Sequence, residues 1–161
     1  MRYQEKGELH LDFHGATATT IDYILRCSGK EALRKIMTRT ARRVYREIYD
    51  ALQAGDTVPL LEHWQYFFTR EGGDFSITRQ SNGDIVLEVK RCPAVRRLME
   101  LGMEVNADFC LQTQMINEAL SENSPFDIHT EKRGECSCTQ TIALNRRRKT
   151  DNTMEAQKEK C

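Results

Sequence analysis

Hydrophobic residues in the first half of the chain recur mostly at intervals of three and four positions, as they do along the buried side of a helix. This spacing predicts three helices, over residues 14–25, 28–55 and 59–71. The second helix begins at a Ser-x-x-Glu capping pattern and is closed by a glycine, and the third begins at a proline. The polar residues 1–13 show only weak alternation and are compatible with a short strand or an irregular lead-in.

In the second half, stretches that alternate with a period of two predict strands between shorter helices. The predicted elements are strands at 75–78 and 85–89, helices at 93–101 and 106–121, and strands at 126–129 and 136–144. An Asn-Gly pair between the first two strands favours a hairpin, and Arg133-Gly134 lies within the second. The order predicts an α+β fold, with helices packed on a four-stranded antiparallel sheet made of two hairpins.

The composition fits one domain. The chain has 161 residues, 39% of them hydrophobic, which is enough for a core. We expect a single domain over residues 1–144 and a polar C-terminal tail over residues 145–161, because that segment has a basic run and few residues that could pack.

The charges and the hydropathy narrow the expected partners. Lys+Arg and Asp+Glu are equal at 24 each, so the net charge gives no case for binding nucleic acid or a membrane. No apolar run is long enough to span a bilayer, and the N-terminus lacks the apolar core of a signal peptide. We therefore expect a cytoplasmic protein, and a homodimer is compatible with the sequence.

In a reducing compartment, six cysteines indicate thiols, metal ligands or a reactive site rather than disulfides. Cys92 precedes Pro93 and is predicted to be the N-cap of the next helix, where the helix dipole lowers the pKa of a thiol. Cys110 lies beside Gln114 and Asn117, off the apolar arc of its predicted helix, so it is either exposed or faces a polar site.

Two more cysteines, Cys136 and Cys138, lie two positions apart in a predicted strand. Their side chains should then point to one face, together with Gln140. Such a pair suits shared metal coordination better than a mutual disulfide. The alternative for all four cysteines is simple core filling, since free cysteine is among the most buried residue types.

Histidines and aromatic residues suggest a pocket between the first helix, the third helix and the sheet. His14 shares the inward side of the first helix, which is more typical of a core residue than of a catalyst. His63 lies at the edge of the aromatic side of the third helix, near Trp64 and Tyr66, where either a ligand pocket or an ordinary amphipathic boundary is expected. The thiols of Cys92 or Cys110 would lie on the far side of the pocket.

These residues carry a resemblance to a known family. Arg91-Cys92-Pro93, Leu98, Leu101-Gly102, Phe109-Cys110 and the Gly134-x3-Cys138 hairpin resemble the C-terminal half of the L-2-amino-thiazoline-4-carboxylic acid hydrolase family. That family in turn resembles the 4-vinyl-reductase-type small-molecule-binding domains. The resemblance implies an α+β fold with helices on an antiparallel sheet.

The resemblance also implies a metal site. Phenol-sensing relatives of the 4-vinyl-reductase type bind a structural zinc through cysteines of this half. Cys110 and Cys138 match those positions best, Cys92 and Cys136 would complete the set, and His129 is a candidate nitrogen ligand. This chain has a threonine where the sensor pattern has a cysteine four residues before the hairpin glycine.

Three functions follow as hypotheses. The first is a hydrolase that opens a thiazoline-type ring in a small sulfur- and nitrogen-containing acid, with His14, His63, Cys92 and Cys110 as catalytic candidates. The second is a sensor domain that binds a small molecule, with Trp64 and Tyr66 as ligand-binding residues and zinc or a thiol cluster as a structural element. The third is an interaction domain whose cysteines fill the core.

Overall fold

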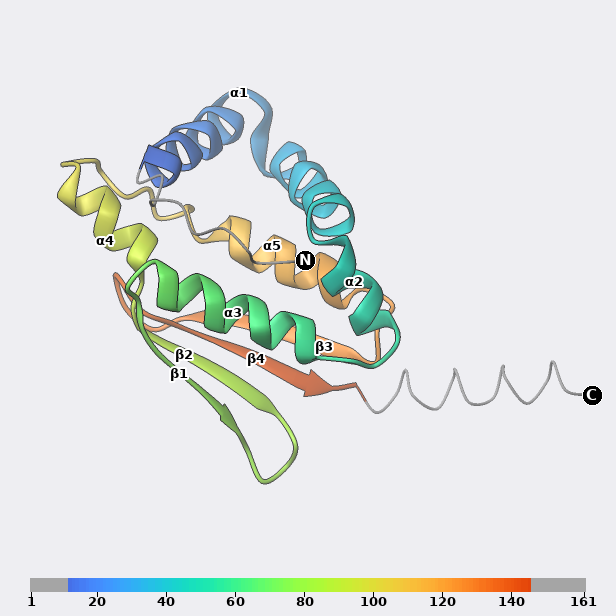
Figure 1. Ribbon diagram of the computed structural model, residues 1–161. Coiled ribbons are helices and arrows are strands. Elements are labelled where there is room, and N and C mark those ends of the chain that lie inside the picture. The colour runs from blue at the N-terminus through green and yellow to red at the C-terminus, as the bar shows by residue number, and fades with distance from the viewer. Residues whose placement is uncertain (1–11, 146–161) are drawn as a thin grey trace, which may run out of the picture.

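The computed structural model describes residues 12–145, which form five helices and four strands. In chain order these are α1 (Asp12–Arg43), α2 (Arg46–Gln53), α3 (Val58–Arg70), β1 (Asp74–Arg79), β2 (Ile85–Arg91), α4 (Pro93–Glu100), α5 (Leu111–Ser121), β3 (Phe126–Lys132) and β4 (Cys138–Leu144). The strands form one antiparallel sheet in the order β1-β2-β4-β3, and the helices lie on one side of it (Figure 1). This arrangement confirms the predicted α+β class and the sheet made of two hairpins.

The strand register decides which side chains face the helices. In β2, Ile85, Leu87 and Val89 are buried, and the residues between them face the other side of the sheet. The antiparallel pairing places Leu87 opposite Gln140 and Val89 opposite Cys138 of β4. The inward side of the sheet is therefore apolar except at a few positions, and Gln140 is one of them.

The long helix α1 bends at Gly29, close to the predicted break between the first two helices. Gly29 has φ 77° and ψ 177°, a combination that essentially only glycine adopts. The bend lets α1 arch over α5 (Figure 1). Two ion pairs, Arg34–Glu118 and Arg42–Glu122, join the second part of α1 to α5 and its C-cap.

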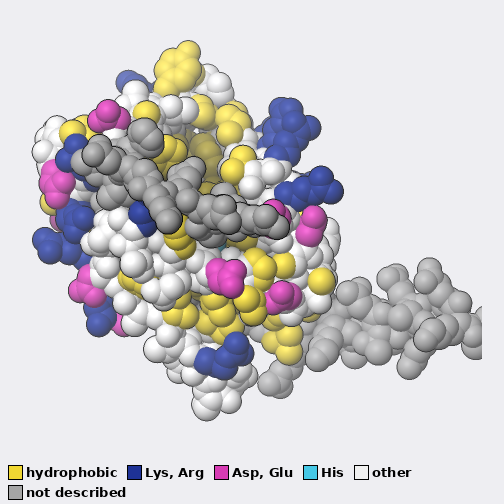
Figure 2. Space-filling view, viewed as in Figure 1, with side chains coloured by type: hydrophobic (Ala, Val, Ile, Leu, Met, Phe, Trp, Pro, Cys, Tyr) yellow, Lys and Arg dark blue, Asp and Glu magenta, His cyan; other side chains and the backbone are white. Residues whose placement is uncertain are grey.

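The helix predicted over residues 28–55 is interrupted after Arg43, which corrects the sequence-based boundary. The backbone N–H groups of Val44 and Tyr45 both donate to the carbonyl oxygen of Thr40, at 2.9 and 3.2 Å. Val44 is 59% exposed, and Tyr45 packs against the core. Figure 2 shows hydrophobic side chains gathered over the region of α3.

The helix predicted over residues 106–121 begins at Leu111. Before it, Asn106 accepts two hydrogen bonds, at Oδ1 from the N–H of Asp108 and at its carbonyl from the N–H of Phe109, both at 2.9 Å. An asparagine that satisfies neighbouring backbone groups in this way competes with helix formation. Cys110 is therefore the N-cap of α5 rather than a residue within the helix.

The core consists of two clusters of buried residues. One lies between the sheet and the helices α2 and α3 and includes Leu60 and Leu87. The other joins α1, α4 and α5 and includes Leu33 and Leu98. Cys92, at the junction of β2 and α4, packs against both clusters.

The predicted start of the tail at residue 145 falls at the last described residue. Asn145 donates from its backbone N–H to the carbonyl of Pro125 and from Nδ2 to the carboxylate of Asp127, both at 2.8 Å, so it packs with the domain. The rest of the predicted tail, and most of the stretch 1–13 that was left open, lie outside the described residues. Between residues 12 and 145, no helix has both the length and the hydropathy needed to cross a membrane.

Candidate functional site

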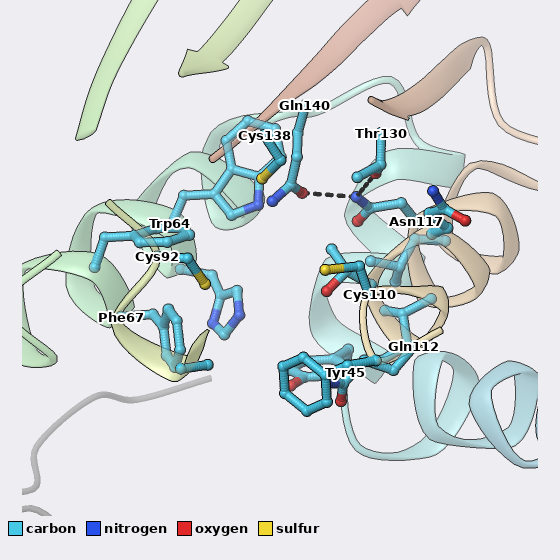
Figure 3. A pocket seen from close by; sticks show the side chains of 18 of the residues that line it. Tyr45, Trp64, Phe67, Cys92, Cys110, Gln112, Asn117, Thr130, Cys138 and Gln140 are labelled. Atoms are coloured by element: carbon cyan, nitrogen blue, oxygen red, sulfur yellow. Dashed lines mark hydrogen bonds between the residues drawn. The ribbon is translucent and has the colours of Figure 1, made fainter. Parts of the chain in front are cut away.

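A cavity of about 210 Å³ lies between the start of α1, the helices α3 and α5, and the inward side of β3 and β4. Its place agrees with the pocket predicted between the first helix, the third helix and the sheet. His14, His63, Trp64, Cys92 and Cys110 all contribute to its lining. Figure 3 shows the side chains that surround it, with Trp64 and Phe67 on one side and Cys110 and Asn117 on the other.

Aromatic rings form one wall of the cavity. The imidazole of His63 lies edge-on to Tyr45, with 5.2 Å between the ring centroids, and is stacked against Phe67 at 6.3 Å. Burial among these rings lowers the pKa of His63 to about 4, because the charged form loses its hydration. His63 is therefore a neutral imidazole near neutral pH.

His14 lies at the same cavity but has an acidic partner. Its Nε2 is 3.2 Å from Oε2 of Glu71, the C-cap residue of α3, and His14 itself is buried. Arg96 of α4 donates to the carbonyl oxygens of Glu71 and Gly72 and so fixes this end of α3. The contact therefore joins the first turn of α1 to α3 and supplies a histidine–carboxylate pair beside the cavity.

Three thiols reach the cavity, those of Cys92, Cys110 and Cys138. Burial is the main cause that raises the pKa of each one, to about 12 for Cys138. Neighbouring thiols raise these pKa values further: Cys92 acts on Cys110, both act on Cys138, and Cys136 acts on Cys92 and Cys110. Cys92 is the N-cap of α4 as predicted, but its pKa is raised overall rather than lowered. The N–H groups of Ala94 and Val95 do lower it, but burial outweighs them.

Cys92 and Cys110, two of the catalytic candidates, lack the lowered pKa that a nucleophilic thiol needs, since the thiolate is the nucleophile. Near neutral pH these groups are protonated thiols. In that form they are small, polarisable surfaces and weak hydrogen-bond donors.

The fourth cysteine of the predicted set lies elsewhere. Cys136 precedes β4 in the hairpin loop, so it does not share the strand face of Cys138. Its carbonyl accepts the N–H of Cys92 at 2.7 Å, and its sulfur lies 3.6 Å from the sulfur of Met99. Cys136 thus packs beneath α4 and does not line the cavity.

Two further predicted residues lie outside the cavity lining. Tyr66 points away along α3, where its hydroxyl accepts a hydrogen bond from Nη1 of Arg70 at 2.9 Å. His129 is exposed in β3, and it alternates with Thr130, which lines the cavity, so it faces the opposite side of the sheet.

Three polar side chains at the inward side of the sheet were not among the predicted site residues. Nδ2 of Asn117 donates to Oε1 of Gln140 at 2.7 Å and to Oγ1 of Thr130 at 2.8 Å. Asn117 and Gln140 are each only 4% exposed. The signal that could have identified them is a polar residue at an inward position. Gln140 is such a residue in an alternating strand, and Asn117 lies on the same side of the helix as Cys110.

The residues do not fit the zinc site that the resemblance implies. Within residues 12–145, no three or more His, Cys, Asp or Glu side chains are grouped so that they could hold a metal ion. Cys136 lies in the hairpin loop outside the cavity lining, and His129 faces the side of the sheet opposite the cavity. Zinc binding stays a prediction that this arrangement of side chains does not support.

Comparison of the chain with protein-family models, with curated proteins and with solved structures finds no match. The resemblance to the thiazoline hydrolases therefore stays a prediction from the residues that carry it. The function has to be argued from the chemistry of the cavity.

Proposed function

We propose that this protein binds a small, ring-containing molecule in the cavity between α3, α5 and the sheet. The observation that carries the proposal is the combination of an aromatic wall with buried amide side chains around about 210 Å³ of space. Small-ligand sites are typically apolar cavities with a few oriented polar groups. An engineered cavity of about 150 Å³ in another protein holds benzene, so one substituted ring is the matching size.

Binding explains the protonation states better than catalysis does. The thiols at the cavity have raised pKa values and His63 has a lowered one, so each is in its neutral form near neutral pH. Neutral groups in a partly apolar cavity favour retention of a ligand. Nucleophilic catalysis by a thiol instead needs an ion pair or a neighbouring base that stabilises the thiolate.

The test is a screen of ring-containing fragments by thermal shift, with Cys110→Phe as the variant that fills the cavity. Ligands that bind the folded state raise the Tm of the wild-type protein by mass action, and the filled cavity should abolish the increase. Cys27→Phe is the matched control, because Cys27 is exposed on α1. Fragments that stabilise wild type and Cys110→Phe equally, or no stabilising fragment at all, would contradict the proposal.

A second candidate function is hydrolysis of a thiazoline-type ring in a small acid, and the His14–Glu71 pair favours it. A carboxylate that accepts the Nε2 proton of His14 leaves Nδ1 as the basic nitrogen, which can take a proton from water. The water oxygen would attack the C=N carbon, and the proton held by His14 would pass to the ring nitrogen. His14 would then take the proton of the added hydroxyl as the C=O bond forms and the C–S bond breaks, and would return that proton to the leaving sulfur. Lys132, the one lysine among the described residues of the lining, can pair with the carboxylate of the substrate.

This second function is tested with 2-aminothiazoline-4-carboxylic acid, by following the release of a small-molecule thiol. His14→Gln and Glu71→Gln should each lower kcat by about 10² if His14 is the base and Glu71 positions it. His129→Gln, on the opposite side of the sheet, is the control and should retain full activity. Absence of thiol release by the wild-type protein would exclude this function while leaving ligand binding intact.

A further inference from the structure

The hydrogen bonds of the buried amides have a fixed direction. Nδ2 of Asn117 carries two hydrogens, and both are used, one by Oε1 of Gln140 and the other by Oγ1 of Thr130. Reversing the Asn117 amide alone would bring its oxygen against the oxygen of Gln140, and reversing both amides together would still leave one donor beside one acceptor. The network therefore determines which atoms of these side chains are left to interact with a ligand.

What the network presents to the cavity is a donor beside an acceptor. The nitrogen of Asn117 is used, so Asn117 offers the acceptor Oδ1. The oxygen of Gln140 is used, so Gln140 offers the donor Nε2, whose second hydrogen remains beside the one directed at the sulfur of Cys138. Figure 3 shows the nitrogen end of Gln140 on the side of Cys138 and Trp64, and the oxygen end of Asn117 on the side of Cys110. The hydroxyl of Thr130 accepts from Asn117, so its own hydrogen is a further donor.

The lining also determines the charge of the buried part of a ligand. Among the described residues that line the cavity there is no Asp, Glu or Arg, and Lys132 is an exposed side chain at the edge. A charged group without a partner in such a site costs several kcal/mol, whereas a neutral group that finds both a donor and an acceptor does not. The buried part of the ligand should therefore be uncharged and carry both hydrogen-bonding functions.

We infer that the cavity recognises a cyclic amide, with the ligand carbonyl accepting from Nε2 of Gln140 and the ligand N–H donating to Oδ1 of Asn117. The ring then lies against Trp64, in space that suits one substituted ring. An anionic substituent can extend to Lys132 at the edge without changing this pattern. The inference rests on the proposed function, because it specifies the ligand of the same cavity.

The test uses the single tryptophan of the chain, Trp64, as a fluorescent reporter inside the cavity. The wild-type protein is titrated with three probes of similar size, namely 2-piperidone, N-methyl-2-piperidone and cyclohexane. The first has the N–H and the carbonyl, the second lacks the N–H, and the third lacks both. We expect 2-piperidone to bind about tenfold or more tightly than either of the others, since each of those leaves a buried protein group unpaired.

Two variants assign the effect to the amides. Gln140→Leu removes the donor and should abolish the preference for 2-piperidone over cyclohexane, while Gln65→Leu, an exposed position on α3, should keep it. Should Gln140→Leu fail to fold, the comparison of the three probes on the wild-type protein decides alone. Equal or stronger binding of cyclohexane overturns the inference but leaves the proposed function standing. A cavity that binds none of these probes, nor any fragment of the thermal-shift screen, overturns both.

Discussion

His63 lies between two aromatic rings, and this packing determines how it titrates. Its pKa in the folded protein is about 4, against an ordinary value of 6.5 for an exposed imidazole. Between these two values the unfolded chain binds a proton that the folded protein does not bind. The free energy of unfolding therefore decreases as the pH falls through this window.

We predict that lowering the pH from about 7 to about 5 lowers the free energy of unfolding by about 2 kcal/mol through His63 alone. His63→Gln should remove this part of the pH dependence, because glutamine does not titrate. Urea unfolding of both proteins at the two pH values measures the difference. His129→Gln, at an exposed position, should retain the pH dependence of the wild-type protein; an unchanged slope in His63→Gln would contradict the prediction.

The thiols differ in their exposure and therefore in their expected reactivity. Burial raises the pKa of Cys138 from 9.0 to about 12, whereas Cys27 is exposed on α1. Each unit of pKa lowers the thiolate fraction about tenfold. Cys138 should then have about a thousandfold less thiolate than a thiol with the ordinary value.

We accordingly predict that iodoacetamide near neutral pH modifies Cys27 long before Cys138. Peptide mapping by mass spectrometry after short exposures measures the order of modification. In urea both thiols should react at similar rates, which serves as the control for sequence effects. Early modification of Cys138 in the folded protein would show that its pKa is not raised and would reopen the nucleophilic role of the cavity thiols.

At the scale of the elements, the two interruptions of the long helical stretch have different causes. The bend at Gly29 is local, because the residue adopts a backbone conformation that other residues rarely adopt. The break near Tyr45 has no such residue, and the apolar spacing continues across it. Packing of Tyr45 against His63 and the core accompanies that break.

The Gly29 bend gives a direct prediction. Gly29→Ala should lower the free energy of unfolding by about 1–3 kcal/mol, because alanine is strained at φ 77° and ψ 177° although nothing lies within 4 Å of the added Cβ. Gly15→Ala is the control within the same helix, where the added Cβ makes ordinary contacts at 3.5 Å with Leu101 and Met103. It should be neutral or stabilising, since alanine has the higher helix propensity. Chemical unfolding measures the free energy of unfolding of the two variants. A lower value for Gly15→Ala than for Gly29→Ala would contradict the prediction.

At the scale of the whole molecule, the two core clusters share a boundary. Cys92 packs against both clusters. The ion pairs Arg34–Glu118 and Arg42–Glu122 join α1 to α5 and its C-cap. The cavity lies where the two clusters meet, since Trp64 belongs to one and Phe109 to the other. Loss of either cluster should therefore destabilise the other.

We predict that both clusters unfold in one transition. Leu87→Ala and Leu98→Ala each remove a buried side chain from a different cluster, and each should lower the free energy of unfolding by about 2–5 kcal/mol. In both variants, Trp64 fluorescence and far-UV circular dichroism should report the same urea midpoint. Two separated midpoints in either variant would show that the clusters are independent units and that residues 1–144 are not a single domain.

The sequence by itself determined the fold class and most of the elements, because hydrophobic period and turn residues act over a few neighbouring positions. The Asn-Gly hairpin, the break at Gly29 and the N-cap position of Cys92 all depend on such local chemistry. It also placed His14 and Trp64 on inward faces, and left His63 at the edge of one.

Only the tertiary structure decided the chemistry of the cavity. The pKa of Cys92 depends on burial by distant elements, which outweighs the local helix terminus. The loop position of Cys136 and the network of Asn117, Thr130 and Gln140 depend on strand register and on how α5 crosses the sheet. Such contacts join residues far apart in the chain, and a periodic pattern records only that a position faces inward, not which side chain it meets there.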